Sequence, residues 1–354
     1  MRYFALVMLL GLVPLAALGA EIQENVVYNG WKCVVLKNAT TEAFIAPEIG
    51  GRLIQYQVDG QEWLWVNRDL AGKVFPLAEN SNMEIWKNYG GDKLWPAPQG
   101  WDRPEQWPGP GDEVIEAPFT YEILKQSGPE VKLRIVGSGG GGWAGVQFIR
   151  ELTLKDGDNK LTSIITMKNV SNRTVSWGIW EVAQMDWSDQ GVKKGKEDWN
   201  EEAYLAIPMN PKSRWPERYR EMFGQASSWN WQPDYDRNLM IVHYMNQVGK
   251  LNLDVSAGWA AMVDPQKGAT YVQRFEGQDP KKIYPDGGNY EVWVAGKGEF
   301  LHKHKLRVAA DDPKSRFVEM EIQGPKVTLK PGQSTTLTTS MEVVKGGLEA
   351  VPKK

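Results

Sequence analysis

Residues 146–167 read VQFIRELTLKDGDNKLTSIITM, which is two strand-like runs, Val146–Leu154 and Leu161–Met167, around a short polar segment. The polar segment, Asp156-Gly-Asp-Asn159, is typical of a hairpin turn, because glycine, asparagine and aspartate tolerate the backbone angles that tight turns require. Two extended runs joined in this way predict an antiparallel β-hairpin.

Extended runs of the same kind recur along the chain, and helical patterns are nearly absent. Only Ser213–Phe223 has a helical pattern, which Pro216 weakens. The glycine-rich run Gly137–Gly142 leads directly into a strand, so we interpret it as a hairpin loop and not as a domain boundary. Residues 21–354 therefore predict a single all-β domain, a large antiparallel β-sandwich with few short helices. The other expected strands are Val26–Val35, Leu53–Val58, Phe119–Leu124, Val131–Val136, Val175–Met185, Leu239–Tyr244, Trp259–Val263, Tyr271–Phe275, Tyr290–Val294, Phe300–Val308, Phe317–Ile322 and Ser334–Val343, the last of them preceded by the turn Lys330–Gln333.

Four tryptophans, Trp86, Trp95, Trp101 and Trp107, lie within 22 residues together with three glycines and three prolines, and a fourth proline follows directly. So much proline and glycine argues against a helix or a central strand, so an ordered loop is expected. Indole rings on a rigid loop can form a flat apolar platform with N–H donors at its edge, which suits a sugar ring. Alternatively, the loop closes one end of the sandwich and its tryptophans belong to the core.

The composition points to an exported protein. Met1-Arg2 is followed by an apolar run, Tyr3–Leu18, and by small residues, so residues 1–20 predict a signal peptide cleaved near Ala20. The remaining chain has no second hydrophobic span, which argues against stable membrane insertion. Its single cysteine, Cys33, fits export to a periplasm, although secretion stays open. The net charge is −3 and there is no basic block, so a nucleic-acid partner is not expected; the oligomeric state is left open.

Several motifs occur in the order seen in galactose-mutarotase-like proteins. Pro47–Gly60 resembles the opening strands of that superfamily, and Gly90–Pro96 is similar to the Gly-Gly-x-x-x-Trp-Pro loop of its hexose-phosphate epimerase branch. Val318–Pro325 and Leu329–Gly332 resemble the closing Glu-x-Gln strand and Leu-x-Pro-Gly turn. The complete pattern is most similar to a bacterial family known as domain of unknown function 4380 (DUF4380). The resemblance implies a β-supersandwich with a concave sheet that binds a saccharide.

The resemblance also implies a role for the closing strand. In mutarotases a glutamate of the Glu-x-Gln strand is the general base, and Glu321 matches it by position, with Gln323 as the following polar residue. A histidine of another strand assists as the acid. The corresponding stretch here, Ser171–Glu181, contains no histidine.

Strand periodicity places two acidic residues of this strand side by side. Successive residues face opposite sides, so Glu319, Glu321 and Gln323 share a face with Phe317. Neighbouring carboxylates raise one another's pKa, as acid–base catalysis requires. The alternative is a solvated polar face without a catalytic role.

Glu181 is the only charged member of another predicted strand face. The face also holds aliphatic and indole side chains, so the pKa of Glu181 should be raised, a property suited to a proton donor that replaces the missing histidine. A salt bridge to an arginine or a bulge that turns the side chain outward are the alternatives. The other members of this face are Val175, Trp177, Ile179, Ala183, Met185 and Trp187.

Candidate sugar contacts gather around the tryptophan-rich stretch. Trp95 and Trp101 are expected to stack on a sugar ring, and Asp92 and Lys93 to hydrogen-bond with its hydroxyl groups. Arg52, next to a pair of glycines, could clamp hydroxyls or a uronate with its guanidinium fork.

The sequence contains three histidines, each of which is a candidate ligand. His243 is interpreted as a buried or cleft-edge histidine, with a sugar contact as the alternative. His302 and His304 share a strand face and could hold a metal, but no third ligand is identifiable nearby, so packing or hydrogen bonding is expected instead.

One acidic turn is a candidate calcium site. Asp286, Asn289 and Glu291 bring oxygen atoms close together at a spacing that could bind calcium, yet Asp-Gly-Gly-Asn is also an ordinary tight turn. We expect the turn and no cofactor, with calcium as the alternative.

Two functions remain open. The first is an exported carbohydrate-binding protein that holds a saccharide in a concave, tryptophan-rich cleft. The alternative is a sugar-processing enzyme, an aldose epimerase-like protein that uses Glu321 as general base and Glu181 as acid.

Overall fold

The computed structural model describes residues 19–77, 86–99, 109, 113–188, 197–224, 229–302 and 305–352. Nearly all regular structure in them is β, as expected. The helical segments of the described residues are short: α1 (Glu113–Glu116) and the 3-10 helices η1 (Pro47–Ile49), η2 (Arg68–Leu70) and η4 (Leu348–Ala350). Residues 1–18 of the predicted signal peptide lie outside the described residues.

Two antiparallel sheets make up the sandwich. The larger sheet has 13 strands among the described residues. Its main path runs through β14 (Arg220–Phe223), β17 (Gly249–Leu253), β20 (Tyr290–Val294), β23 (Phe317–Gln323), β12 (Val175–Asp186), β6 (Asp92–Ala97), β4 (Arg52–Val58), β3 (Thr41–Ala46), β2 (Trp31–Lys37), β1 (Ala20–Tyr28) and β8 (Ser127–Gly128), with β5 (Gln61–Glu62) beside β4 and β24 (Val327–Leu329) beside β12.

The smaller sheet has ten strands among the described residues, and a separate hairpin accompanies the two sheets. The sheet runs through β15 (Trp231–Asp234), β16 (Leu239–Val242), β13 (Tyr204–Pro208), β18 (Trp259–Asp264), β19 (Ala269–Arg274), β25 (Ser334–Lys345), β11 (Leu161–Asn169), β10 (Val146–Lys155), β9 (Glu130–Val136) and β7 (Thr120–Lys125); the hairpin is β21 (Gly298–His302) with β22 (Lys305–Ala309).

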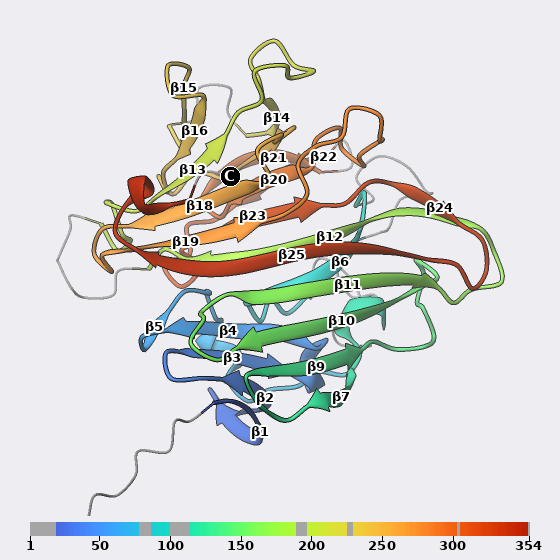
Figure 1. The fold of residues 1–354 in the computed structure, drawn as a ribbon. Helices are drawn as coiled ribbons and strands as arrows, with labels where there is room; N and C mark the ends of the chain where they lie inside the picture. Colours follow the sequence, from blue (N-terminus) through green and yellow to red (C-terminus); the bar gives the residue numbers. More distant parts are fainter. Residues whose placement is uncertain are drawn as a thin grey trace, which may run out of the picture.

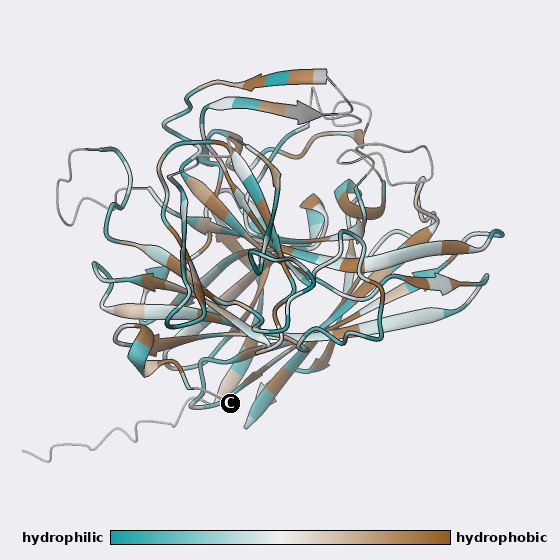
Figure 2. Ribbon diagram, turned by 90° about the horizontal axis from the view of Figure 1, so that it is seen from above, coloured by the Kyte–Doolittle hydropathy of each residue, from teal (hydrophilic) through white to brown (hydrophobic). Residues whose placement is uncertain are grey.

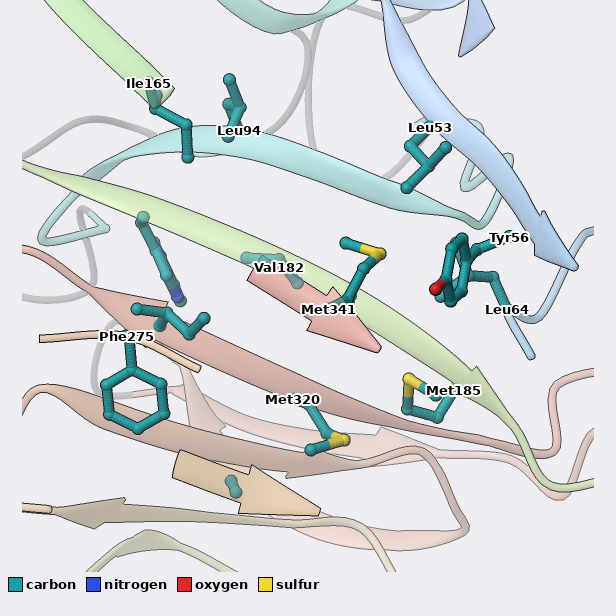
Figure 3. Close-up of a cluster of buried hydrophobic side chains, with 14 of the residues drawn as sticks. Leu53, Tyr56, Leu64, Leu94, Ile165, Val182, Met185, Phe275, Met320 and Met341 are labelled. Atoms are coloured by element: carbon teal, nitrogen blue, oxygen red, sulfur yellow. The ribbon is translucent and has the colours of Figure 1, made fainter. Parts of the chain in front are cut away.

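The core fills the space between the sheets. Long strands β12 and β25 cross the middle of the molecule (Figure 1). Leu94 and Met320 of the larger sheet meet Ile165 and Met341 of the smaller sheet in one buried cluster (Figure 3). Hydrophobic segments accordingly gather on the strands of the interior, and hydrophilic ones on peripheral loops and strand ends (Figure 2).

The hairpin predicted at residues 146–167 is confirmed. β10 pairs with β11 from Val146–Asn169 to Leu154–Leu161, around the predicted turn. Alternate residues of both strands are buried, as expected for strands with one face on the core. The glycine-rich run is also confirmed as a hairpin loop, because β9 before it pairs with β10 after it.

Three expected elements are wrong. Val26–Val35 is not one strand but the meeting of β1 and β2, because Asn29 and Gly30 both adopt positive φ angles (45° and 85°) and form a tight turn. Phe300–Val308 is likewise split, into β21 and β22. Ser213–Phe223 forms turns and then β14 instead of a helix, which agrees with the proline in it.

The tryptophan-rich stretch also differs from the prediction, because it contains a central strand. β6 lies between β12 and β4 and carries Pro96. β6 pairs with β4 only at Asp92, opposite Leu53. Pro96 lies after this pair, so its missing N–H group costs no hydrogen bond to β4. Gly90 precedes the strand with φ of 92°, and a Cβ atom there would collide with the carbonyl oxygen of Trp65. Glycine and proline here shape a strand within the sheet.

Candidate functional site

Five neighbouring strands bring charged and aromatic side chains onto one face of the larger sheet. Residues paired across antiparallel strands point to the same side, so the register of β6, β12, β23, β20 and β17 defines this face. The alternate residues contact the smaller sheet, as Glu181 does through Arg150. We therefore call the first face the outer face. It carries Lys93 and Trp95 on β6, Trp180 and Gln184 on β12, Glu319, Glu321 and Gln323 on β23, Glu291 and Trp293 on β20, and Lys250 and Asn252 on β17.

Lys250 lies between two carboxylates of the outer face. Its Nζ is 2.8 Å from Glu291 Oε2 and 2.9 Å from Glu321 Oε2. Trp180 donates from Nε1 to the same Glu321 oxygen at 2.9 Å, and the ammonium lies 4.6 Å from the centre of the Trp180 ring. All four side chains are buried. Burial by itself lowers the pKa of Lys250, but the charges of Glu291 and Glu321 outweigh it and raise the pKa, so this lysine is charged.

The carboxyl group of Glu321 is not fully compensated. Burial raises its pKa well above the ordinary value; Lys250 opposes the shift, and Glu291 adds to it. One cation, Lys250, serves two carboxylates, and Glu321 holds a proton more tightly than a free carboxylate does. A carboxylate that holds a proton more tightly is also a stronger base when it is ionised.

A second ion pair lies beside the first on the outer face. Lys93 Nζ is 3.1 Å from Glu319 Oε1, and Gln184 donates to the same oxygen at 2.8 Å. The ammonium faces two indole rings, with its nitrogen 4.9 Å from the ring centre of Trp95 and 5.8 Å from that of Trp86. Burial lowers the pKa of Lys93, and Glu319 opposes this effect.

Several buried acceptor oxygens of this face lack a hydrogen-bond donor among the described residues. They are Glu321 Oε1, Gln184 Oε1, Gln323 Oε1 and Asn252 Oδ1. A buried acceptor without a donor is destabilising by about 1–3 kcal/mol, and most buried polar atoms in proteins are satisfied. The amide oxygens and nitrogens can be exchanged by a flip, but the carboxylate oxygen of Glu321 cannot. The outer face therefore fits a ligand that brings hydroxyl donors.

Asp92 and Glu181 lie on the opposite face, against the smaller sheet. Arg150 of β10 reaches across the core and pairs with both carboxylates, and its Nε donates to Ser163 at 2.9 Å. Burial raises the pKa of Glu181 to about 7, and the nearby charge of Asp92 adds to the shift, which agrees with the predicted desolvation. Of the alternatives predicted for Glu181, the structure shows the salt bridge to an arginine, Arg150. Neither residue is brought together with Glu321.

Arg52 makes its contacts with backbone carbonyl groups and with one carboxylate. Its Nε donates to Ile49 O at 2.8 Å and its Nη1 to Gly90 O at 3.1 Å. Its Nη2 is 3.5 Å from a carboxylate oxygen of Glu116. The side chain is buried, and its hydrogen bonds link the two glycine turns; a contact between Arg52 and a sugar stays a prediction.

Gln323 is placed on the outer face, as predicted. Its Nε2 donates to Asp286 at 3.2 Å. Burial, with the charge of Glu291, raises the pKa of Asp286 to about 7. The turn before β20 therefore contributes a second carboxyl group of unusual pKa beside the Lys250 cluster.

The turn expected at Asp286–Asn289 is present, with Gly287 N donating to Tyr284 O at 3.2 Å. Its oxygen atoms have protein partners: the side-chain oxygen of Asn289 accepts from Val255 N at 2.8 Å, and Glu291 pairs with Lys250. Within the part of the chain that the structure describes, no group of three His, Cys, Asp or Glu side chains could hold a metal ion.

His243 lies elsewhere, just after β16 of the smaller sheet. Its ring centre is 5.9 Å from that of Tyr204, and burial lowers its pKa. With Tyr204, Tyr235 and Asp234 it lines a separate cavity of about 710 Å³. It is therefore not a neighbour of Glu321. Trp101 and His304 lie outside the described residues, as does the side chain of His302.

Sequence reasoning missed Lys250 and Trp180 as members of the site. It named Glu291 only as a candidate calcium ligand and not as the partner of a lysine. The run Gly249–Leu253 alternates polar and apolar residues, which is a strand signal. Its lysine could have been assigned to a strand face. No local pattern would have paired that lysine with Glu321, because β17 and β23 meet only through β20.

Among the described residues, no helix has both the length and the apolar character needed to cross a membrane. No family model matches the chain, and no curated protein matches its sequence.

Solved structures do match, and they establish the fold. A galactose mutarotase-like protein from Clostridium acetobutylicum aligns with a TM-score of 0.55 at 13% identity, over 92% of this chain and 99% of that one. One from Lactobacillus casei aligns with a TM-score of 0.52 at 14% identity, over 88% and 100%. A TPR-domain containing protein from Parabacteroides distasonis aligns with a TM-score of 0.54 at 14% identity over 96% of this chain, which spans 56% of that protein. The chain thus has the galactose mutarotase-like sandwich fold.

Proposed function

We propose that this protein binds a saccharide across the outer face, in a cleft lined by Trp86, Trp95 and Trp180. The observation that carries the proposal is the group of buried acceptor oxygens without a donor among the described residues, which includes Glu321 Oε1. Sugar hydroxyls are donors that satisfy such oxygens. Trp86, the partly exposed indole of this face, supports the proposal further, because the apolar C–H face of a pyranose packs on an aromatic ring.

The charges of the site favour a neutral sugar. Lys93 is paired with Glu319, and Lys250 with both Glu291 and Glu321. Both lysines thus already have carboxylate partners. A phosphorylated or uronic sugar would bring a further negative charge without a free cation among these described residues to pair with it, which is unfavourable in a buried site.

The proposal predicts a change in intrinsic tryptophan fluorescence when neutral aldoses and their oligosaccharides are added. Glucose 6-phosphate and glucuronate should bind more weakly than glucose. Trp180→Phe keeps a ring but removes the donor to Glu321, so it should weaken binding about tenfold. Trp229→Phe, at a residue that is 68% exposed, is the matched control and should change nothing. If no neutral sugar binds to the wild-type protein, the proposal fails.

The second candidate function is aldose 1-epimerase activity, favoured by the raised pKa of Glu321. In this reaction a base takes the proton of the anomeric hydroxyl, the bond between C1 and the ring oxygen breaks, and an acid protonates that oxygen; closure on the other face of C1 reverses these transfers. Glu321 is suited to be the base. We propose Lys93 as the acid, because it shares the outer face, has a lowered pKa and interacts electrostatically with Glu321. Glu181 does not share this face.

Glu321→Gln tests the catalytic role. The wild-type protein should accelerate the change in optical rotation of a freshly dissolved α-anomer of the sugar that binds. Removing the base should slow this by about 10²–10⁴-fold, while the Kd for the sugar changes by only a few-fold. Glu276→Gln, at a side chain that is 65% exposed, is the control. An equal rate for wild type and Glu321→Gln would remove the base from this position.

We also propose that the protein is exported after cleavage near Ala20, to a periplasm or the medium, and that it belongs to the DUF4380 family. The apolar run before Ala20 supports export, and the order of the motifs supports the family.

A further inference from the structure

We propose that the site takes a saccharide of at least two sugar units, with the second ring in an aromatic cavity beside the outer face. This inference rests on the proposed function, because it assumes that the first ring lies over Glu319 and Glu321. It adds a second subsite and therefore the class of ligand, an oligosaccharide or the end of a glycan chain.

The cavity has a volume of about 460 Å³, within the usual range of small-molecule sites. Its walls come from separate parts of the chain: Trp293 of β20, Phe317 of β23, Phe300 of β21 and Arg307 of β22. The hairpin β21–β22 belongs to neither sheet, and it supplies one wall of the cavity while β20 and β23 of the larger sheet supply another.

Aromatic rings dominate two sides of the cavity. Phe300 packs edge-on against Trp293 with ring centres 5.8 Å apart, and Phe223 contacts both rings. On the other side Phe317 lies 4.5 Å from Trp65, measured between ring centres. Rings held in place by one another offer a stacking surface at low entropic cost, which suits the apolar face of a second pyranose.

The cavity borders the outer face, because Trp293 and Phe317 of its wall lie on that face. Trp293 is paired with Glu319 across β20 and β23, so the two side chains are neighbours on the same side. Phe317 precedes Glu319 by two residues on the same strand face. Asn88, which also lines the cavity, lies just before the glycine turn that leads to Lys93. The second of two linked rings would therefore lie next to Trp293 when the first lies over Glu319.

The charged groups of the cavity suit a neutral ring. Arg316 at its base is neutralised by protein carboxylates: its Nε and Nη2 each lie 2.9 Å from Asp198, and its Nη1 lies 2.7 Å from Asp311. The guanidinium group of Arg316 is thus already paired and has little charge left to attract an anionic ligand. Arg307 and Asp312, also in the lining, supply a donor and an acceptor for the hydroxyl groups of a sugar.

Chain-length dependence of binding tests the inference. The probes are glucose with cellobiose, maltose and maltotriose, galactose with galactobiose, mannose with mannobiose, and xylose with xylobiose, titrated by calorimetry. For the sugar that binds, the disaccharide should bind about tenfold more tightly than the monosaccharide. Phe300→Ala should abolish this advantage and leave the monosaccharide Kd unchanged. Phe75→Ala, which removes a half-buried ring that packs on Tyr89 away from the cavity, is the matched control.

Each outcome separates the inference from the proposed function. If a monosaccharide and its disaccharide bind equally, or if Phe300→Ala preserves the difference, the second subsite is wrong while the first stands. If no sugar of any length binds, both are wrong. Thermal melting of Phe300→Ala checks that the variant is folded, and the stronger binding of disaccharides by the wild type does not depend on that variant.

Discussion

Lys250→Met is expected to destabilise the protein by about 3–5 kcal/mol and to abolish saccharide binding. The substitution leaves Glu291 and Glu321 buried without their shared cation. Methionine is an unbranched side chain that fills similar space, so the loss is electrostatic and not a matter of volume. Urea denaturation followed by circular dichroism measures the change in the free energy of unfolding.

Two further variants make the Lys250 prediction specific. Lys345→Met removes a lysine whose side chain is 88% exposed, 3.4 Å from Asp59, and should change stability by less than about 1 kcal/mol. Combining Lys250→Met with Glu291→Gln removes one of the two unpaired charges and should recover part of the loss. If Lys250→Met unfolds at the same urea concentration as Lys345→Met, the buried cluster does not stabilise the fold.

Arg150→Met is expected to have an effect of similar size, about 3–5 kcal/mol, through the interior of the sandwich. Arg150 is the cation between Asp92 and Glu181, and it joins the smaller sheet to β6 and β12. Without it, two buried carboxylates of the core lose their partner. Because β6 and β12 also carry Lys93 and Trp180 on their other face, saccharide binding should weaken as well.

The loss caused by Arg150→Met should depend on pH. The pKa of Glu181 is raised from 4.5 to about 7 in the folded protein, so the folded state holds its proton more tightly than the unfolded chain. The stability linked to this proton is complete below about pH 4.5 and is lost as the pH rises to about 7. Removing the cation raises the pKa of Glu181 further. Urea denaturation should therefore show a larger loss at pH 8 than at pH 5.

Replacement of the carboxyl group provides the control for this pH dependence. Glu181→Gln removes the titrating group, so the double variant Arg150→Met/Glu181→Gln should lose less stability at pH 8 than Arg150→Met alone. Equal losses at pH 5 and pH 8 in Arg150→Met would show that Glu181 keeps an ordinary pKa and that the interior pair is not buried as described.

The sequence by itself determined the class of fold and the faces of individual strands. Alternation along Phe317–Ile322 correctly placed Glu319 and Glu321 together, because the period of a strand is a local property of the backbone. The same reasoning correctly isolated Glu181 on an apolar face. Sequence reasoning missed the strand at Asp92–Ala97, because proline and glycine argue against a central strand. Pro96 is tolerated there because β4 pairs with β6 only at Asp92, and this register is not visible in the sequence.

Only the tertiary structure decided what each face meets. Glu181 and Glu321 lie on neighbouring strands of one sheet, yet one points into the core toward Arg150 and the other outward to Lys250. These two cations lie in the sequence 31 residues from Glu181 and 71 residues from Glu321. Such pairings are set by strand order and by the stacking of the two sheets, for which no local sequence pattern exists. The sequence therefore determined the strands and their sides, and the packing of the sheets decided which side holds the site.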